Sequence, residues 1–198
     1  HMTKIISQGI PQRIIRDTQS FQLVAIIEGA SANTQFINNL QVVGQQRRLV
    51  AEVSQKIAAL PATATSEERS ALTTQQSQIN TSLAKNVEFM AKHYGYSVKN
   101  NYLLSPVQSA LLLKATDEKG QPVADESKAT VVAELRTAES YEDLQFLRNK
   151  LGALSADSSK KDEVEAIKAE LKQKFDFDVN AHYILQVVKG ALYATVEA

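Results

Sequence analysis

The sequence contains no cysteine and no tryptophan, and it has only four prolines and seven glycines among its 198 residues. The absence of cysteine excludes disulfide bonds, thiolate catalysis and zinc or iron–sulfur sites with cysteine ligands. Because the seven glycines stand singly, there is no G-x-G-x-x-G pattern, no P-loop and no G-x-S-x-G nucleophile elbow. These absences remove the usual motifs of nucleotide-binding proteins and serine hydrolases.

The chain also has no block of one charge sign and no long apolar run. Its 22 basic residues balance 22 acidic ones, and like charges adjoin only in pairs such as Arg47-Arg48. This balance argues against nucleic acid as a partner. No apolar run approaches the roughly 20 residues that span a bilayer, so we expect no transmembrane segment. With 43% apolar and 22% charged residues, the composition is that of a folded globular protein.

The composition also bears on location. His1-Met2 is typical of an expression tag, so a native signal peptide or anchor could precede this sequence. Because the chain lacks cysteine and is rich in Gln, Ser, Thr and Asn, we expect a periplasmic or extracellular protein of a bacterial-type cell envelope. A cytoplasmic location is the alternative.

An internal repeat is the strongest pattern in the sequence. Residues 94–111 align without a gap on residues 175–192, at an offset of 81 positions, with six identities. Further upstream, residues 56–60 resemble residues 150–154. We interpret this as an internal duplication of a strand, helix, helix, strand unit. The first unit is expected at 3–120 and the second at 121–198, either pooled in one pseudosymmetric domain or forming two lobes.

Residue spacing predicts the elements of each unit. Alternation and β-branched residues favour strands near 4–6, 13–16, 21–27, 102–114 and 128–135, the last with a helix start as the competing interpretation. Spacings of three and four residues predict helices over 34–60 and up to Met90, the second opened by a capping box from Thr65 to Glu68. Further helix starts are predicted at Ser140 and Ser159. Pro106 makes the strand around it either an edge strand or a bulged one.

The first helical hairpin should be longer than the second. From the hairpin turn to the repeat is 38 positions in the first unit and 25 in the second, a difference of 13. Shared between two helices, 13 residues lengthen a hairpin by roughly 10 Å. We therefore expect the first hairpin to protrude from the body.

Candidate metal ligands are few. His93 and His182 fall at non-equivalent places in the repeat, and neither has a second histidine at helical spacing. Asp176, Asp178 and Asn180 are spaced like the start of a calcium loop, but Ala181 replaces the turn glycine and Val187 replaces the bidentate glutamate. We expect these groups to cap and solvate a loop, and we expect no metal and no cofactor.

The repeat also carries aromatic residues in both copies: Tyr94, Tyr96, Tyr102, Phe175, Phe177 and Tyr183. A ligand cage is one interpretation of such a set. Packing is the better one, because a duplicated scaffold retains core contacts in both halves, whereas a binding site is needed in one.

The expected fold is α+β: two duplicated strand, helical hairpin, strand units that share a mostly antiparallel sheet, with the first hairpin longer. The expected function is that of a non-enzymatic interaction or scaffold protein that binds a protein partner through the longer hairpin or a sheet edge; a homo-oligomer is left open. The alternative is an enzyme that uses carboxylates or tyrosines in a crevice between the units. The candidate partner-binding residues at the hairpin tip are Thr65, Glu68, Arg69, Leu72, Gln75 and Gln76.

Overall fold

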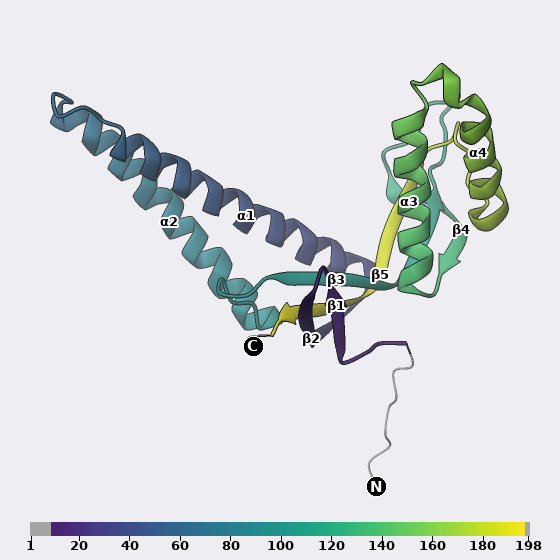
Figure 1. Ribbon diagram of the computed structural model, residues 1–198, viewed down its shortest axis with the longest axis horizontal. Coiled ribbons are helices and arrows are strands. Elements are labelled where there is room, and N and C mark those ends of the chain that lie inside the picture. Colours follow the sequence, from purple (N-terminus) through teal and green to yellow (C-terminus); the bar gives the residue numbers. More distant parts are fainter. Residues whose placement is uncertain (1–8, 197–198) are drawn as a thin grey trace, which may run out of the picture.

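The computed structural model describes residues 9–196, which form four α-helices and a five-stranded antiparallel sheet (Figure 1). The strands are β1 (Arg13–Arg16), β2 (Gln19–Glu28), β3 (Tyr102–Leu113), β4 (Thr130–Leu135) and β5 (Tyr183–Thr195). The helices are α1 (Ala30–Ala58), α2 (Ser66–Tyr94), α3 (Ala138–Leu154) and α4 (Lys161–Phe175). The expected α+β class and antiparallel sheet are confirmed. The strand expected at 4–6 and the His1-Met2 pair lie outside the described residues.

The sheet interleaves strands from the two halves of the chain. Its order is β1-β2-β5-β3-β4, so β2 pairs with β5 and β4 pairs with β3. The hairpin α1–α2 connects β2 to β3 and α3–α4 connects β4 to β5, so neither hairpin joins neighbouring strands. The long central pair of β3 and β5 holds the halves together, from Tyr102 opposite Ala194 to Leu113 opposite Tyr183.

The offset of 81 residues reappears in the local structure of the repeat. The α2 helix ends at Gly95 and α4 ends at Asp176, both in the left-handed conformation. Ser97 N donates to Tyr102 Oη at 2.7 Å, and Asp178 N donates to Tyr183 Oη at 2.8 Å. Residues 94–113 and 175–194 therefore both form a helix end, a loop and a strand. The duplication itself stays a prediction from the sequence.

Pro106 is accommodated by a bulge in β3. The register between β3 and β5 shifts between Ser105 and Gln108, and β4 pairs with β3 only from Ser109 onward. Pro106 therefore stands where the ladder is irregular and where one side of β3 has no neighbouring strand. This position removes the cost of its missing backbone donor.

The helix starts were predicted with mixed success. The capping box at Thr65 and Glu68 is confirmed, and the segment from 130 is a strand rather than a helix start. The cap of α3 predicted at Ser140 is wrong: Thr137 is the N-cap and its hydroxyl accepts from Ser140 N at 3.1 Å. An upstream hydroxyl thus occupies the capping role three residues earlier.

The start of α4 is also displaced from its expected cap. Ser159 lies inside a 3-10 turn, η2 (Ser158–Lys160), and does not cap α4. Asp157 precedes that turn and accepts from both Ser159 N (2.9 Å) and Ser159 Oγ (2.6 Å). These hydrogen bonds hold the pKa of Asp157 below its usual value. Asp157 is the capping residue at this turn because a charged carboxylate oxygen is a stronger hydrogen-bond acceptor than the hydroxyl of Ser159.

Three hydrophobic clusters hold the helices and the amino-terminal segment against the sheet. The first, centred on Leu111, Leu144 and Leu171, lies between the short hairpin α3–α4 and the sheet. The second, centred on Phe36, Met90 and Leu192, lies under the root of α1–α2. The third surrounds Tyr193, whose hydroxyl donates to Pro11 O at 2.8 Å. Since successive side chains in a strand point to opposite faces, Leu192 packs in the second cluster on one face of the sheet and Tyr193 packs in the third cluster on the other face.

The long hairpin protrudes further than the sequence predicted. The α1 helix has 29 residues against 17 in α3, and α2 has 29 against 15 in α4, differences of 12 and 14. At 1.5 Å per residue, each helix is about 20 Å longer than its counterpart. The expected lengthening of about 10 Å was wrong, because it counted extra residues in the returning helix only. Figure 1 shows the hairpin projecting away from the sheet. In the described chain, no helix has the length and apolarity to cross a membrane.

The turn between β1 and β2 is strained. Arg16 pairs with Gln19, so Asp17 and Thr18 form a two-residue loop, and both have positive φ, 50° and 67°. A two-residue loop with positive φ at both positions matches the twist of a hairpin, but it favours Asn, Asp or Gly. Thr18 is β-branched, so the left-handed conformation crowds its side chain.

Replacing Thr18 with glycine should therefore stabilise the protein by about 1 kcal/mol, because it removes this crowding. Thr130→Gly is the matched control, since Thr130 is an exposed strand residue without a positive φ. The control should lose about 0.5–1 kcal/mol through added chain entropy in the unfolded state. Urea unfolding of the three proteins measures both changes. Equal losses in the two variants would show that the turn is unstrained.

Candidate functional site

The outer part of the long hairpin, residues 46–86, is called the arm here. Asn86 Nδ2 donates to Gln46 Oε1 at 2.9 Å, which marks its inner limit. Between that limit and the sheet lie the buried side chains of Phe36, Val43 and Met90. The structure describes the arm in full, and Val53, 2% exposed, is its one buried residue. The arm is therefore a two-helix structure with almost no core.

Two polar pairs join the helices along the arm. Besides the Asn86–Gln46 pair, Gln76 Nε2 donates to Ser54 Oγ at 2.5 Å. Gln76 and Asn86 are thus polar residues of α2 whose side chains form hydrogen bonds across to α1. Such pairs fix the alignment of two helices at some cost in stability. The arm is thus held in register by amide groups rather than by burial.

The structure separates the six candidate tip residues. Thr65 and Glu68 bond each other in the capping box, with N–O distances of 3.0 and 3.2 Å. Leu72 and Gln76 are half-buried along the seam with α1. Arg69 and Gln75 are exposed, and within the described chain neither side chain has a hydrogen bond or ion pair. These two are the ones most accessible to a partner.

Sequence analysis missed three apolar side chains on the hairpin. Val42 and Leu49 on α1 are 41% and 44% exposed, and Phe89 on α2 is 38% exposed. Val42 and Leu49 lie seven residues apart, hence on one helix stripe, next to the stripe that faces α2. The seven-residue spacing was detectable, but the neighbouring stripe of Val43 and Val50 obscured it.

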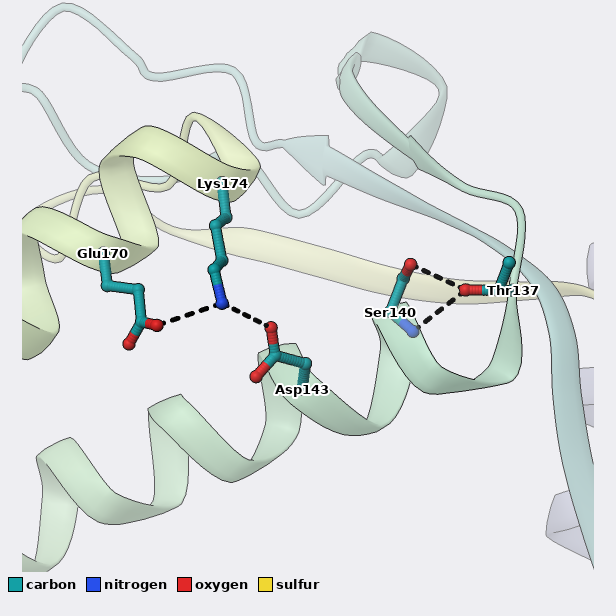
Figure 2. Close-up of polar contacts among 5 residues, drawn as sticks. All are labelled: Thr137, Ser140, Asp143, Glu170 and Lys174. Atoms are coloured by element: carbon teal, nitrogen blue, oxygen red, sulfur yellow. Dashed lines mark hydrogen bonds and ion pairs between the residues drawn. The ribbon is translucent and has the colours of Figure 1, made fainter.

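The short hairpin differs in how its helices are joined. Lys174 Nζ on α4 lies 3.2 Å from Asp143 Oδ2 on α3 and 3.0 Å from Glu170 Oε1 (Figure 2). The hydrogen bonds to Glu170 and then to Asp143 raise the pKa of Lys174. Figure 2 also shows the Thr137 cap at the start of α3. Charge and a buried leucine core hold this hairpin together, and it ends soon after its core does.

Four of the six aromatic residues of the repeat stack in pairs, one pair in each copy. Tyr96 stacks on Tyr102 with centroids 4.8 Å apart, and Phe177 stacks on Tyr183 at 4.5 Å. The phenol oxygens of Tyr102 and Tyr183 accept hydrogen bonds from main-chain amides. This is the packing arrangement expected from their presence in both copies.

The histidines and aspartates of the repeat contact different neighbours. His93 stacks on Phe89 with centroids 4.0 Å apart, and His182 is exposed. Asp176 ends α4 and bonds Lys172, while Asp178 accepts from Asn180 N. Within residues 9–196, no three His, Asp or Glu side chains come close enough together to hold a metal ion.

A polar hollow of about 590 Å³ lies at the root of α1. One wall consists of residues from the first turns of α1: Ala30, Ser31, Thr34, Gln35, Asn38 and Asn39. Glu126, from the 3-10 turn η1 (Glu126–Lys128), and Gln186, from β5, complete it. The hollow thus brings together the start of the long hairpin and elements of the second half of the chain. It offers one carboxylate and no tyrosine to the enzyme considered as an alternative.

Comparison with known proteins identifies no relative. No protein-family model, no curated protein and no solved structure matches the chain. The function must therefore be inferred from the chain's own geometry and chemistry.

Proposed function

We propose that this chain is a non-enzymatic interaction protein that binds a protein partner through the long hairpin α1–α2. The observation that carries the proposal is the difference between the two hairpins of one fold. The short hairpin ends near its core, whereas the long one continues about 20 Å further per helix. Folding the sheet does not explain the extra length.

The energetics of the arm support this interpretation. Ordering a residue costs roughly 1–2 kcal/mol of backbone entropy, and buried apolar surface is the main compensation. The arm buries one side chain fully, Val53. A segment so weakly supported by burial adds little to the stability of the whole. Its retention is better explained by contacts that it makes with another molecule.

The surface of the hairpin fits a protein partner. Its middle exposes Val42, Leu49 and Phe89, and its end exposes Arg69 and Gln75. Protein interfaces combine an apolar centre rich in aromatic residues and arginine with a polar rim. The proposed contact surface therefore extends from the middle of the hairpin to its tip. It includes apolar residues that were absent from the sequence-based set.

A sheet edge is the second candidate surface. Strand β4 pairs with β3 on one side, has no other strand neighbour among the described residues, and exposes 52% of Val131. An extended partner segment can add to such an edge through main-chain hydrogen bonds. The long hairpin is preferred, because the edge strand has six residues and sits beside the exposed charges of Glu134 and Arg136. Charges on an edge discourage strand addition.

Site-specific photo-crosslinking distinguishes these surfaces. A benzophenone side chain is placed at Gln75 on the arm, at Val131 on the sheet edge, or at Ala156 in the tip loop of the short hairpin. Each protein is irradiated in native extract from the source cells, and the adducts are compared. We expect a discrete adduct of defined mass from Gln75, and none of that mass from Ala156 or Val131.

The control at Ala156 matters because it is also exposed and also lies at the end of a hairpin. An adduct common to Gln75 and Ala156 indicates nonspecific capture and counts against the arm. An adduct from Val131 alone would move the binding surface to the sheet edge.

A further inference from the structure

We propose that the polar hollow at the root of α1 binds a neutral, hydroxyl-rich ligand, with a sugar unit as the chemical class. This site lies apart from the arm and does not depend on its role. Its volume of about 590 Å³ falls in the range of small-molecule sites, roughly 300–1,000 Å³.

The fold supplies the hollow with side chains from three elements. Gly29 N donates to Val188 O at 2.6 Å, which fixes the start of α1 against β5. Residues 31, 35 and 38 then recur at spacings of four and three along α1, so their side chains share one helix face. Gln186 is contributed by β5 and Glu126 by η1. The η1 turn is capped by Asp125, whose carboxylate accepts a hydrogen bond from Ser127 N at 3.0 Å.

The polar groups of this hollow are not used by the fold. Within the described chain, none of the seven polar side chains that line it makes a side-chain hydrogen bond or an ion pair: Ser31, Thr34, Gln35, Asn38, Asn39, Glu126 and Gln186. Elsewhere the amides of Gln46, Gln76 and Asn86 are paired with one another or with serine. Seven unpaired polar side chains around one hollow offer donors and acceptors to a ligand.

The charge and polarity of the lining side chains indicate which class of ligand fits the hollow. Glu126 is the one charged residue of the lining, and the described lining holds no cation, so an anionic ligand is disfavoured. Ala30 is the one apolar residue, so the apolar surface of the hollow comes mainly from carbon atoms of polar side chains, which the C–H groups of a sugar can contact. Amides and hydroxyls each donate and accept, and a carboxylate accepts from two neighbouring hydroxyls. A sugar presents matching pairs of donors and acceptors.

A peptide is a less good match. Its recognition relies on an open strand edge for its main chain and on apolar pockets for its side chains. The hollow provides side-chain amides and a single alanine methyl. Because Ser31, Thr34, Gln35 and Asn38 are exposed, water competes with the ligand, and a dissociation constant on the order of 1 mM is expected for one sugar unit.

The test is a titration of the ¹⁵N-labelled full chain with maltose, followed by ¹H–¹⁵N NMR. Glucose 6-phosphate serves as the anionic comparator and a blocked Gly-Ser-Gly peptide as the peptide comparator. Maltose should shift amides at 30–39, 126 and 186 in a saturable manner. The double variant Gln35→Ala/Asn38→Ala should bind at least tenfold more weakly, which corresponds to about 1.4 kcal/mol.

The control is the double variant Gln41→Ala/Gln45→Ala, which removes two amides of α1 that do not line the hollow. It should bind maltose as the unmodified chain does, and matching far-ultraviolet circular dichroism spectra confirm that both variants fold. Absence of saturable shifts with maltose would overturn the proposal. So would stronger binding of the peptide or the phosphate, or equal weakening by both double variants.

Discussion

Replacing Gly190 with alanine is expected to destabilise the protein by about 3 kcal/mol, the upper end for overpacking a tight core. Gly190 lies in β5 beneath the start of α1. A Cβ at this position would overlap Asn33 Oδ1 and would come within 2.7 Å of Leu104 Cδ1. Asn33 is fully buried and cannot move aside without giving up its own hydrogen bonds. For a chain of this size, the melting temperature should fall by roughly 10 °C.

Gly152→Ala is the matched control. Gly152 lies in α3, and no neighbouring atom is within 4 Å of the position a Cβ would take. Alanine is a better helix former than glycine, so this variant should gain about 0.5–1 kcal/mol. Urea unfolding of both variants measures their free energies of unfolding, which should change in opposite directions. A Gly190→Ala protein as stable as the original would show that β5 and α1 are not in close contact.

Replacing Asn33 with alanine is expected to cost about 2 kcal/mol, because it removes a buried amide that hydrogen-bonds main-chain carbonyls of β2, β5 and the start of α1. Asn33 Nδ2 donates to Ile27 O at 2.9 Å, to Gly29 O at 2.8 Å and to Val188 O at 3.4 Å. Gly29 O and Val188 O keep main-chain donors after the change, and Ile27 stays paired with Gly190 in the β2–β5 ladder, so the cost is that of the lost side-chain hydrogen bonds. Asn38→Ala, at a more exposed position of the same helix, should be nearly neutral.

The aspartate variant adds a pH dependence. In Asn33→Asp, a carboxylate would face the carbonyls that Asn33 now serves, so the folded state would hold its proton more tightly than the unfolded state. The pKa of the introduced carboxyl group in the folded protein would therefore be raised, and stability should increase as the pH falls through it. Melts at pH 4 and pH 7 measure this trend. A variant whose stability is the same at both pH values would show that position 33 is not buried.

The two positions should also be coupled. The Cβ of Gly190→Ala collides with Asn33 Oδ1, and Asn33→Ala removes that atom. The double variant should therefore be less destabilised than the sum of the two single variants. Additive losses would indicate that the collision with Leu104, rather than with Asn33, dominates the cost.

Much of the fold follows from local sequence patterns. The three-and-four spacing from Phe36 to Leu60 predicted α1, and the Thr65 capping box predicted the start of α2. Alternation at 21–27 predicted β2. These features depend on residues close in sequence, whose local physics does not need the rest of the chain. The bulge at Pro106 was one of two expected outcomes for the same reason.

Features that depend on distant partners were not predicted. The pairing of β2 with β5 joins residues more than 160 positions apart. The bridge from Lys174 to Asp143 spans two helices, and Gln76 pairs with Ser54 only because the hairpin aligns them. The hollow likewise assembles Gln35, Glu126 and Gln186 from three elements. No local pattern distinguishes these polar residues from others on exposed surfaces.

The most direct measurement for the central claim compares the full chain with a shortened arm. Deleting residues 50–56 and 73–79 removes two turns from each helix, about 10 Å of reach. The seven-residue deletions keep helix faces in register, so Ile57 takes the place of Val50 and Leu72 that of Ile79. The tip loop and its Thr65 capping box are retained.

Partner capture from native extract and thermal melting are measured on both proteins. The shortened protein should melt within about 3 °C of the full chain, since weakly buried ends tolerate deletion, and its partner capture should fall at least tenfold. Undiminished capture by a folded, shortened protein would contradict the assignment of binding to the arm. Loss of cooperative melting would show instead that the arm belongs to the core.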